Sequence, residues 1–245
     1  MAGTRRPARK RARKKSTRRL SRGAMVLVLI VALAAVAGLY AFEKARHWRP
    51  DERRFPDQGA LVGEEQGPVS FATLKGLGAR FVYLRASDGA GRQDRQFPAH
   101  LAAAREAGLE VGAVHAFDPC VPADGQSANF VTMVPRDRGL LPPAIAMTRL
   151  ASDCPGNVSE AAVQSELMTL VNQIESHAGR AVILAPSEDF EDAYGIARRI
   201  DRNLWLTRDY REPAYGGRPW VMWTANPALA TEAGEEPLAW VVVQP

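Results

Sequence analysis

The stretch LPPAIAMT, which runs from Leu141 to Thr148, decides the fold of this chain. Two prolines form a rigid turn ahead of a short apolar run. Within that run Ala146 and Thr148 stand two positions apart, so they face the same side of an extended chain. A short apolar run that follows turn residues is typical of a buried strand in a parallel sheet. The sequence therefore predicts such a strand over residues 143–149.

The chain after residue 55 alternates β-rich runs with helical runs, which is typical of βα units on a parallel sheet. Five strands are predicted at 60–62, 81–86, 110–117, 143–149 and 181–185, and five helices at 70–77, 98–107, 123–134, 159–178 and 188–194. Three more strands, at 204–207, 220–224 and 240–243, follow without room for full helices between them. The pattern favours an α/β fold, a TIM-like (β/α)5(β)3 barrel, because a regular (β/α)8 barrel needs about 200 residues or more. An open, doubly wound sheet is the alternative.

The amino-terminal part has the composition of a membrane segment. Residues 1–23 hold 11 of the 32 lysines and arginines and no acid, and residues 24–42 carry no charge. As a helix, residues 24–42 would be roughly 28 Å long, close to the roughly 30 Å of a hydrocarbon core. The positive-inside rule then predicts a basic cytoplasmic tail over 1–23 and a single-pass transmembrane signal anchor over 24–42 in the inner membrane. The segment 43–54 is predicted as a linker or helix extension, and the domain over 55–245 is expected in the periplasm or outside the cell.

Two other interpretations of the apolar run stay open. Ala35-Val36-Ala37 has the small residues of a signal peptidase site, and cleavage there would release the rest of the chain. The run is also compatible with a buried helix of a soluble core. The basic flank and the continuation of the apolar run beyond Ala37 favour the uncleaved anchor.

Charge and cysteine content narrow the classes of partner and site. Beyond residue 23 the chain has 21 basic and 27 acidic side chains, so the basic balance belongs to the tail and no nucleic-acid-binding domain is predicted. The two cysteines, Cys120 and Cys154, form an even pair. In an oxidising compartment such a pair predicts a disulfide, whereas a metal site would need further ligands. Two free buried thiols are the alternative, and no metal or cofactor is expected.

Several short motifs then occur in an order known from one family. They are FVYLRASDG at 81–89, Asp94 with Phe97, AAREAGLEVGAVHAF at 103–117, QSANF at 126–130, LPP at 141–143, DRNLWL at 201–206 and RPWVMW at 218–223. Together they resemble glycoside hydrolase family 25, the Chalaropsis-type lysozymes or muramidases, over residues 55–245. The resemblance implies a barrel whose carboxyl end acts on or binds peptidoglycan or a related glycan.

The same resemblance shows where the chain departs from the family. It places Leu61, Ala146, Thr148 and Ala239 where the family carries its acids on the first, central and last strands. Cleavage of a glycosidic bond requires a proton donor and a group that meets the oxocarbenium-like centre. An alanine or leucine has no proton to donate, and a threonine hydroxyl is far too weak an acid. The resemblance therefore implies a lysozyme-like pseudoenzyme.

Other acids on the carboxyl-end loops are candidates to replace the missing ones. They are Glu64, Glu65, Asp88 and Asp118, of which Asp88 occupies a position that matches the family motif. A solvated loop acid is the alternative interpretation of each. We also expect Arg85 and Arg149, near strand ends, as groups that meet a carboxylate of a peptide stem, although the Arg85 stem can also simply extend its head to solvent.

The predicted glycan-binding set is Asp88, His115, Trp223 and Arg149. His115 is a candidate to orient a substrate or, alternatively, a strand histidine that a backbone neighbour satisfies. Trp223 is the tryptophan best suited to stack on a sugar. Core packing is the expectation for the other late tryptophans, which are Trp205, Trp220 and Trp240.

Three functions remain compatible with these patterns. The first is a membrane-anchored lysozyme-like domain that binds peptidoglycan or a related glycan without cutting it. The second is an active muramidase with rearranged acids. The third is a non-enzymatic module that contacts another envelope protein.

Overall fold

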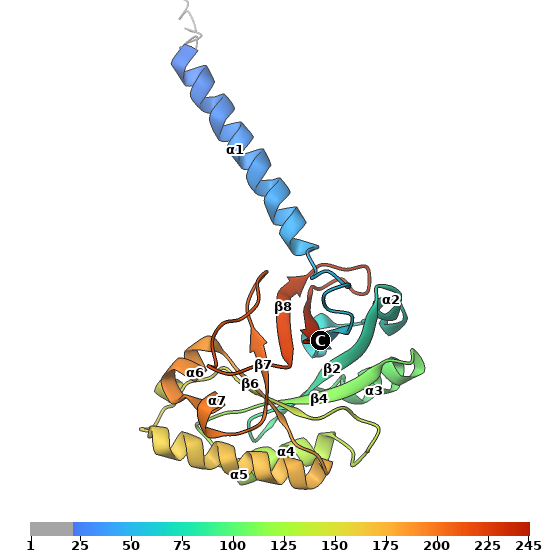
Figure 1. The fold of residues 1–245 in the computed structure, drawn as a ribbon, viewed down its shortest axis with the longest axis vertical. Helices are drawn as coiled ribbons and strands as arrows, with labels where there is room; N and C mark the ends of the chain where they lie inside the picture. The colour runs from blue at the N-terminus through green and yellow to red at the C-terminus, as the bar shows by residue number, and fades with distance from the viewer. Residues whose placement is uncertain (1–21) are drawn as a thin grey trace, which may run out of the picture. The chain divides into compact units, whose positions relative to one another are not determined.

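The computed structural model describes residues 22–245, and the chain separates into two units, residues 1–43 and residues 44–245 (Figure 1). Helix α1 (Arg22–Arg46) is apolar, exposed and long enough over Met25–Arg46 to cross a membrane, although a signal sequence near an amino terminus has the same properties. The predicted span 24–42 lies within α1. The predicted basic tail lies outside the described residues as far as residue 21.

Eight strands of the second unit close into a barrel. They are β1 (Gln58–Val62), β2 (Ala79–Asp88), β4 (Glu110–Ala116), β5 (Ala144–Met147), β6 (Ile183–Pro186), β7 (Asn203–Thr207), β8 (Met222–Leu229) and β9 (Leu238–Val243). Neighbours follow the order β1-β9-β8-β7-β6-β5-β4-β2, and β1 also pairs with β2, which closes the ring. Strand β9 is antiparallel to β1 and β8, and the other barrel pairs are parallel. The predicted barrel is confirmed. The alternative of an open sheet is wrong, because β1 and β2, which would be edge strands of an open sheet, pair with each other.

Helices connect the first five barrel strands and lead into the sixth. They are α2 (Phe71–Gly76), α3 (Phe97–Glu106), α4 (Ala123–Met133), α5 (Glu160–Ala178) and α6 (Glu188–Tyr194), followed by the short α7 (Ile196–Arg199). Ser70 and Ser159 begin α2 and α5, because each hydroxyl accepts an N–H of the first turn. Gly179 ends α5 in the left-handed conformation that glycine adopts without strain. The five predicted helices are present, whereas the sequence did not predict α7.

Three short elements complete the loops around the barrel. They are the 3-10 turns η1 (Glu64–Gln66) and η2 (Ala151–Asp153) and the strand β3 (Arg92–Gln93). Strand β3 folds back on the end of β2 as an antiparallel pair. Because η1 follows β1 and η2 follows β5, both turns lie at the carboxyl end of the barrel.

Side chains along each strand alternate between two apolar layers. On β2, Phe81 and Tyr83 point into the barrel, and Val82 and Leu84 point outward to the layer beneath the helices. The Tyr83 ring lies against Gly112 of β4, where an added Cβ would come 2.3 Å from a ring carbon. Side chains therefore fill the barrel interior at the level of Tyr83 and Gly112.

We expect Gly112→Ala to lower the free energy of unfolding by about 1–3 kcal/mol, because the new methyl group would overlap the Tyr83 ring in a packed interior. Urea unfolding of the full chain in detergent micelles measures this change. Gly91→Ala is the matched control, since a Cβ at Gly91 meets nothing within 4 Å. Equal stability of the two variants would contradict the contact between Tyr83 and Gly112.

Residues 44–57 pack on strands that carry no helix of their own. The rings of Trp48 and Phe55 lie 6.3 and 5.8 Å from the ring of Trp223 on β8. This aromatic contact buries Trp223 on the outer side of the barrel. From residue 44 onward, the segment predicted as a linker or helix extension is part of the compact second unit.

Candidate functional site

The carboxyl ends of the parallel strands and the first residues of β9 meet at one end of the barrel, which we call the mouth. Leu61 of β1 lies opposite Ala239 of β9 in the strand register. Ala146 of β5 is paired with Ala116 of β4 on one side and with Ala185 of β6 on the other. Leu61, Ala146 and Ala185 are partly buried and pack against the inner apolar layer. Small or apolar side chains therefore line the mouth on five strands.

The four positions at which the resemblance places the family's acids all lie toward this end. Leu61 and Ala239 are neighbours across β1 and β9, and Ala146 is the last inward residue of β5. Thr148 follows β5 directly and is exposed. None of these four side chains carries a titratable group.

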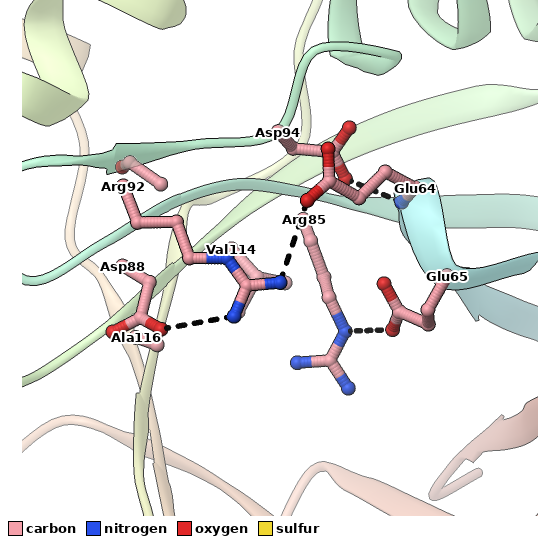
Figure 2. Close-up of a pocket in the computed structure, with 9 residues that line it drawn as sticks. Glu64, Glu65, Arg85, Asp88, Arg92, Asp94, Val114 and Ala116 are labelled. Atoms are coloured by element: carbon pink, nitrogen blue, oxygen red, sulfur yellow. Dashed lines mark hydrogen bonds and ion pairs between the residues drawn. The ribbon is translucent and has the colours of Figure 1, made fainter.

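A cleft of about 260 Å³ opens at the mouth (Figure 2). Its lining consists of Glu64, Glu65, Arg85, Ser87, Asp88, Arg92, Asp94, Val114 and Ala116. These residues come from η1, β2, β3, β4 and the residue after β3, and none comes from β5 or β9. The cleft thus holds four carboxylates and two guanidinium groups, and its lining residue Ala116 is the register partner of Ala146 on the central strand.

Arginines partner three of these carboxylates. Arg85 Nε lies 2.7 Å from Glu65 Oε1, while Arg92 lies 3.4 Å from Glu64 and 3.9 Å from Asp88. The backbone N–H of Arg95 also donates to Glu64, and this bond, followed by the hydrogen bond from Arg92, holds the pKa of Glu64 below its ordinary value. Glu64 is therefore ionised at neutral pH and accepts protons poorly.

The fourth carboxylate, Asp94, is occupied by the backbone. Its two oxygens accept the N–H groups of Glu64 and Gln96 at 2.7 and 2.8 Å. Burial raises the pKa of Asp94, against the opposing effect of these two hydrogen bonds. Asp94 therefore ties η1 to the start of α3 and fixes one wall of the cleft.

Two of the predicted glycan-binding residues lie in the core instead. His115 is fully buried on the outer side of β4, where Nδ1 is 2.8 Å from Ser87 Oγ and Nε2 is 3.3 Å from Gln126 Oε1. Trp223 is also buried, and its Nε1 donates to the Arg208 carbonyl at 2.7 Å. Both side chains are buried, and neither of them lines the cleft at the mouth.

Burial lowers the pKa of His115 to about 4, so its protonation opposes folding. The unfolded chain binds this proton near pH 6.5 and the folded chain only near pH 4. The stabilisation is therefore complete above about pH 6.5 and disappears as the pH falls to about 4, a loss of roughly 3 kcal/mol. Urea unfolding at about pH 7 and about pH 5 should record about 2 kcal/mol of this loss. His115→Gln should flatten the dependence, and an unchanged pH dependence in that variant would contradict the assignment.

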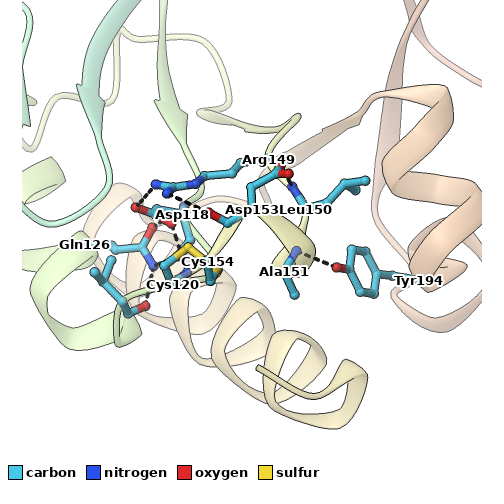
Figure 3. The surroundings of a disulfide bond; sticks show 10 residues. Asp118, Cys120, Gln126, Arg149, Leu150, Ala151, Asp153, Cys154 and Tyr194 are labelled. Atoms are coloured by element: carbon cyan, nitrogen blue, oxygen red, sulfur yellow. Dashed lines mark hydrogen bonds and ion pairs between the residues drawn. A yellow bond between two sulfur atoms is a disulfide. The ribbon is translucent and has the colours of Figure 1, made fainter. Parts of the chain in front are cut away.

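The predicted disulfide between Cys120 and Cys154 is confirmed (Figure 3). It joins the loop after β4 to the loop after β5, and both loops lie at the mouth. Asp118 lies near the two sulfurs, but because the sulfurs are bonded to each other they are not available as thiolate ligands for a metal.

The other two predicted glycan-binding residues, Asp88 and Arg149, have different surroundings at the mouth. Asp88 is exposed and lines the cleft. Arg149 follows β5, and its Nη1 donates to Asp118 Oδ2 at 2.8 Å (Figure 3). Arg149 is therefore already engaged by a carboxylate beside the disulfide, whereas Asp88 is brought together with Glu64 by Arg92.

Arg92 is the charged cleft residue that no sequence motif singled out. It contacts both Glu64 and Asp88 because the β2–β3 hairpin returns it to the end of β2. The run Asp88-Gly89-Ala90-Gly91 carries the turn signal for this hairpin. A basic residue four positions after Asp88, across a predicted turn, therefore indicated an ion-pair partner for Asp88.

A family model described as glycosyl hydrolases family 25 matches residues 62–226. Among solved structures, a family 25 glycosyl hydrolase from Bacillus anthracis has a TM-score of 0.72, is 24% identical, and is matched over 81% of this chain and 93% of that chain. A lysozyme from Streptomyces coelicolor has a TM-score of 0.68 at 18% identity, over 77% and 92% of the two chains. At these identities the likeness shows the fold.

Curated proteins match shorter parts of the chain. The uncharacterised protein YegX of Escherichia coli K12 is 24% identical over 150 residues, which are 60% of this chain and 53% of YegX. Lysozyme M1 of Streptomyces globisporus is 30% identical over 87 residues, which are 33% of this chain and 30% of that enzyme. The chain spans about half the length of the first of these relatives, and less of the second.

Proposed function

Since the chain belongs to glycoside hydrolase family 25, we propose that it is a membrane-anchored, lysozyme-like domain that binds peptidoglycan or a related glycan without cleaving it. The observation that carries this proposal is that the four positions where the family carries its acids hold uncharged side chains. Ala146 and Thr148 occupy the carboxyl end of the central strand, and Leu61 and Ala239 face each other across β1 and β9.

The chemistry of glycoside cleavage supports this proposal. General acid catalysis contributes roughly 10²–10⁴ in rate, and a methyl group or a threonine hydroxyl does not supply it. A carboxylate near the reacting carbon would also stabilise developing positive charge. The uncharged side chains at the four positions where the family carries its acids provide neither contribution.

The carboxylates of the cleft support the same proposal. A general acid must carry its proton at the working pH, but the pKa of Glu64 is held low by its N–H and arginine partners. Glu65 is paired with Arg85, and both oxygens of Asp94 accept backbone N–H groups. The oxygens of these carboxylates are thus engaged by arginines and backbone N–H groups of the cleft itself.

The proposed placement in the cell follows from the amino-terminal sequence. We assign residues 1–23 to a cytoplasmic tail, 24–42 to an uncleaved anchor in the inner membrane, 43–54 to the connection and 55–245 to a periplasmic or external barrel domain. The apolar composition of α1 and the basic residues before it support this orientation. A disulfide in the barrel domain fits an oxidising compartment. Exposure of residues 55–245 to protease added outside intact spheroplasts tests the orientation.

One specific observation favours a second function, an active muramidase with rearranged acids. Arg92 brings Glu64 and Asp88 into one cleft at the mouth, and paired carboxylates are what glycosidases use. Asp88→Asn separates the two proposals. Release of muropeptides by the unmodified chain that Asp88→Asn abolishes would establish the second function and overturn the first.

Binding is tested by sedimentation with insoluble cell-wall sacculi. We expect the full chain in detergent micelles to be retained by the sacculi and to be displaced by soluble glycan fragments. A full chain that stays in the supernatant at every sacculus concentration would overturn glycan binding and leave a protein partner of the envelope as the function to examine.

A further inference from the structure

We propose that Arg85 is the residue that recognises the glycan, by binding a carboxylate that the glycan carries. This inference rests on the proposed glycan-binding function and specifies the ligand chemistry at the cleft. It assigns to Arg85 a role in binding and none in bond cleavage.

The position of Arg85 on β2 directs its side chain to the mouth. Arg85 stands two residues after Tyr83, whose ring fills the barrel interior, and it pairs in register with Val114. Just beyond Arg85 the register of β2 and β4 shifts, so that Ser87 pairs with His115. Arg85 is therefore the last inward-facing residue of β2 before this irregularity.

The guanidinium of Arg85 keeps one edge open. Its Nε faces Glu65 Oε1 at 2.7 Å, and no other described residue forms a hydrogen bond or ion pair with its two terminal nitrogens. Figure 2 shows these nitrogens directed away from the other labelled side chains. The side chain is 45% exposed, so a ligand has access to this edge.

The other cation of the cleft is already engaged. Arg92 lies 3.4 Å from Glu64 and 3.9 Å from Asp88, so two carboxylates share its charge, whereas Arg85 faces Glu65 alone. Two parallel N–H donors match the two oxygens of a carboxylate, and such bidentate pairs are stronger and more selective than single hydrogen bonds. Val114 and Ala116 supply an apolar surface next to this donor pair.

The surrounding charges favour a monoanion over a dianion. The lining holds four carboxylates against two guanidinium groups, so a doubly charged phosphate meets more repulsion than a singly charged carboxylate. On a peptidoglycan-like ligand a carboxylate has two sources. One is the lactyl group of a muramic acid from which an amide-hydrolysing reaction has removed the peptide, and the other is the terminal carboxylate of an attached peptide.

The experiment measures binding of four probes to the full chain in detergent micelles. The probes are peptide-free muramic acid oligosaccharides, peptide-bearing muropeptides, and the methyl ester of each. We expect the unmodified chain to bind a carboxylate probe about 10- to 100-fold more tightly than the ester, as for loss of a charge-assisted bidentate bond. The probe that shows this preference, peptide-free or peptide-bearing, identifies the source of the carboxylate.

Arg85→Gln should remove the preference for the acid and leave the affinity for the ester unchanged. Arg85→Lys should keep part of the preference for the acid. Arg80→Gln is the matched control, because Arg80 lies at the amino end of the same strand and pairs with Asp57. If the unmodified chain is retained on sacculi but binds acid and ester with equal affinity, the role of Arg85 is overturned and the proposed glycan binding stands. Equal loss of acid and ester binding in Arg85→Gln would also overturn that role, and no retention on sacculi would overturn the proposed function as well.

Discussion

The double variant Ala146→Asp/Thr148→Glu is expected to release muropeptides at least roughly 10²–10⁴ times faster than the unmodified chain, the contribution of a general acid. The two substitutions place carboxyl groups at the two positions of the central strand where the resemblance locates the family's acids, on one side of the extended chain. Both positions are partly or fully exposed, so the new carboxyl groups reach solvent and substrate. Chromatography of the soluble products from purified sacculi measures the rate.

The control for this variant is Ala146→Asn/Thr148→Gln. Its side chains have nearly the same shape, but an amide has no acidic proton to donate. We expect no release from the control. If both variants release muropeptides equally, or if neither does so while both remain folded and bound to sacculi, the missing proton donor does not belong on β5.

Removal of the disulfide is expected to lower the free energy of unfolding by about 4 kcal/mol, the chain-entropy contribution for a loop of this length. Cys120 and Cys154 are 34 residues apart, and the loop that they close contains α4 and β5. Cys120→Ser/Cys154→Ser measures the loss by urea unfolding in detergent micelles. The unmodified chain in reductant should match this double variant.

The disulfide also fixes the loops that follow β4 and β5 at the mouth. Arg149 and Asp118 are paired beside it, so loosening these loops should reduce the affinity for sacculi as well as the stability. An unchanged midpoint of unfolding after removal of both sulfurs would contradict the stabilising role of the disulfide.

The sequence predicts the barrel well because the strands and helices of this region carry local signals. The apolar run after Pro142-Pro143 forms β5, and Ser159 and Gly179 bound α5 as their capping chemistry predicts. Three late strands without helices between them are also found. Closure of the sheet follows from the number and order of these strands, so it could be predicted from the sequence.

The direction in which a side chain points was harder to predict. His115 and Trp223 stand on strands beside the mouth, yet both face outward into the core. The register shift between Arg85 and Ser87 changes the alternation along β2, and a one-residue shift exchanges the two faces of a strand. The packing of Trp48 and Phe55 on Trp223 is likewise a long-range contact with no local signal.

The central claim is that an intact family 25 barrel, with uncharged residues at the four positions where the family carries its acids, binds glycan and does not cut it. Its most direct test is muropeptide release by the unmodified full chain from sacculi to which it is bound. We predict complete retention on the sacculi and no release above that of a heat-inactivated sample. Release that grows with the amount of chain and is abolished by Asp88→Asn would contradict the claim.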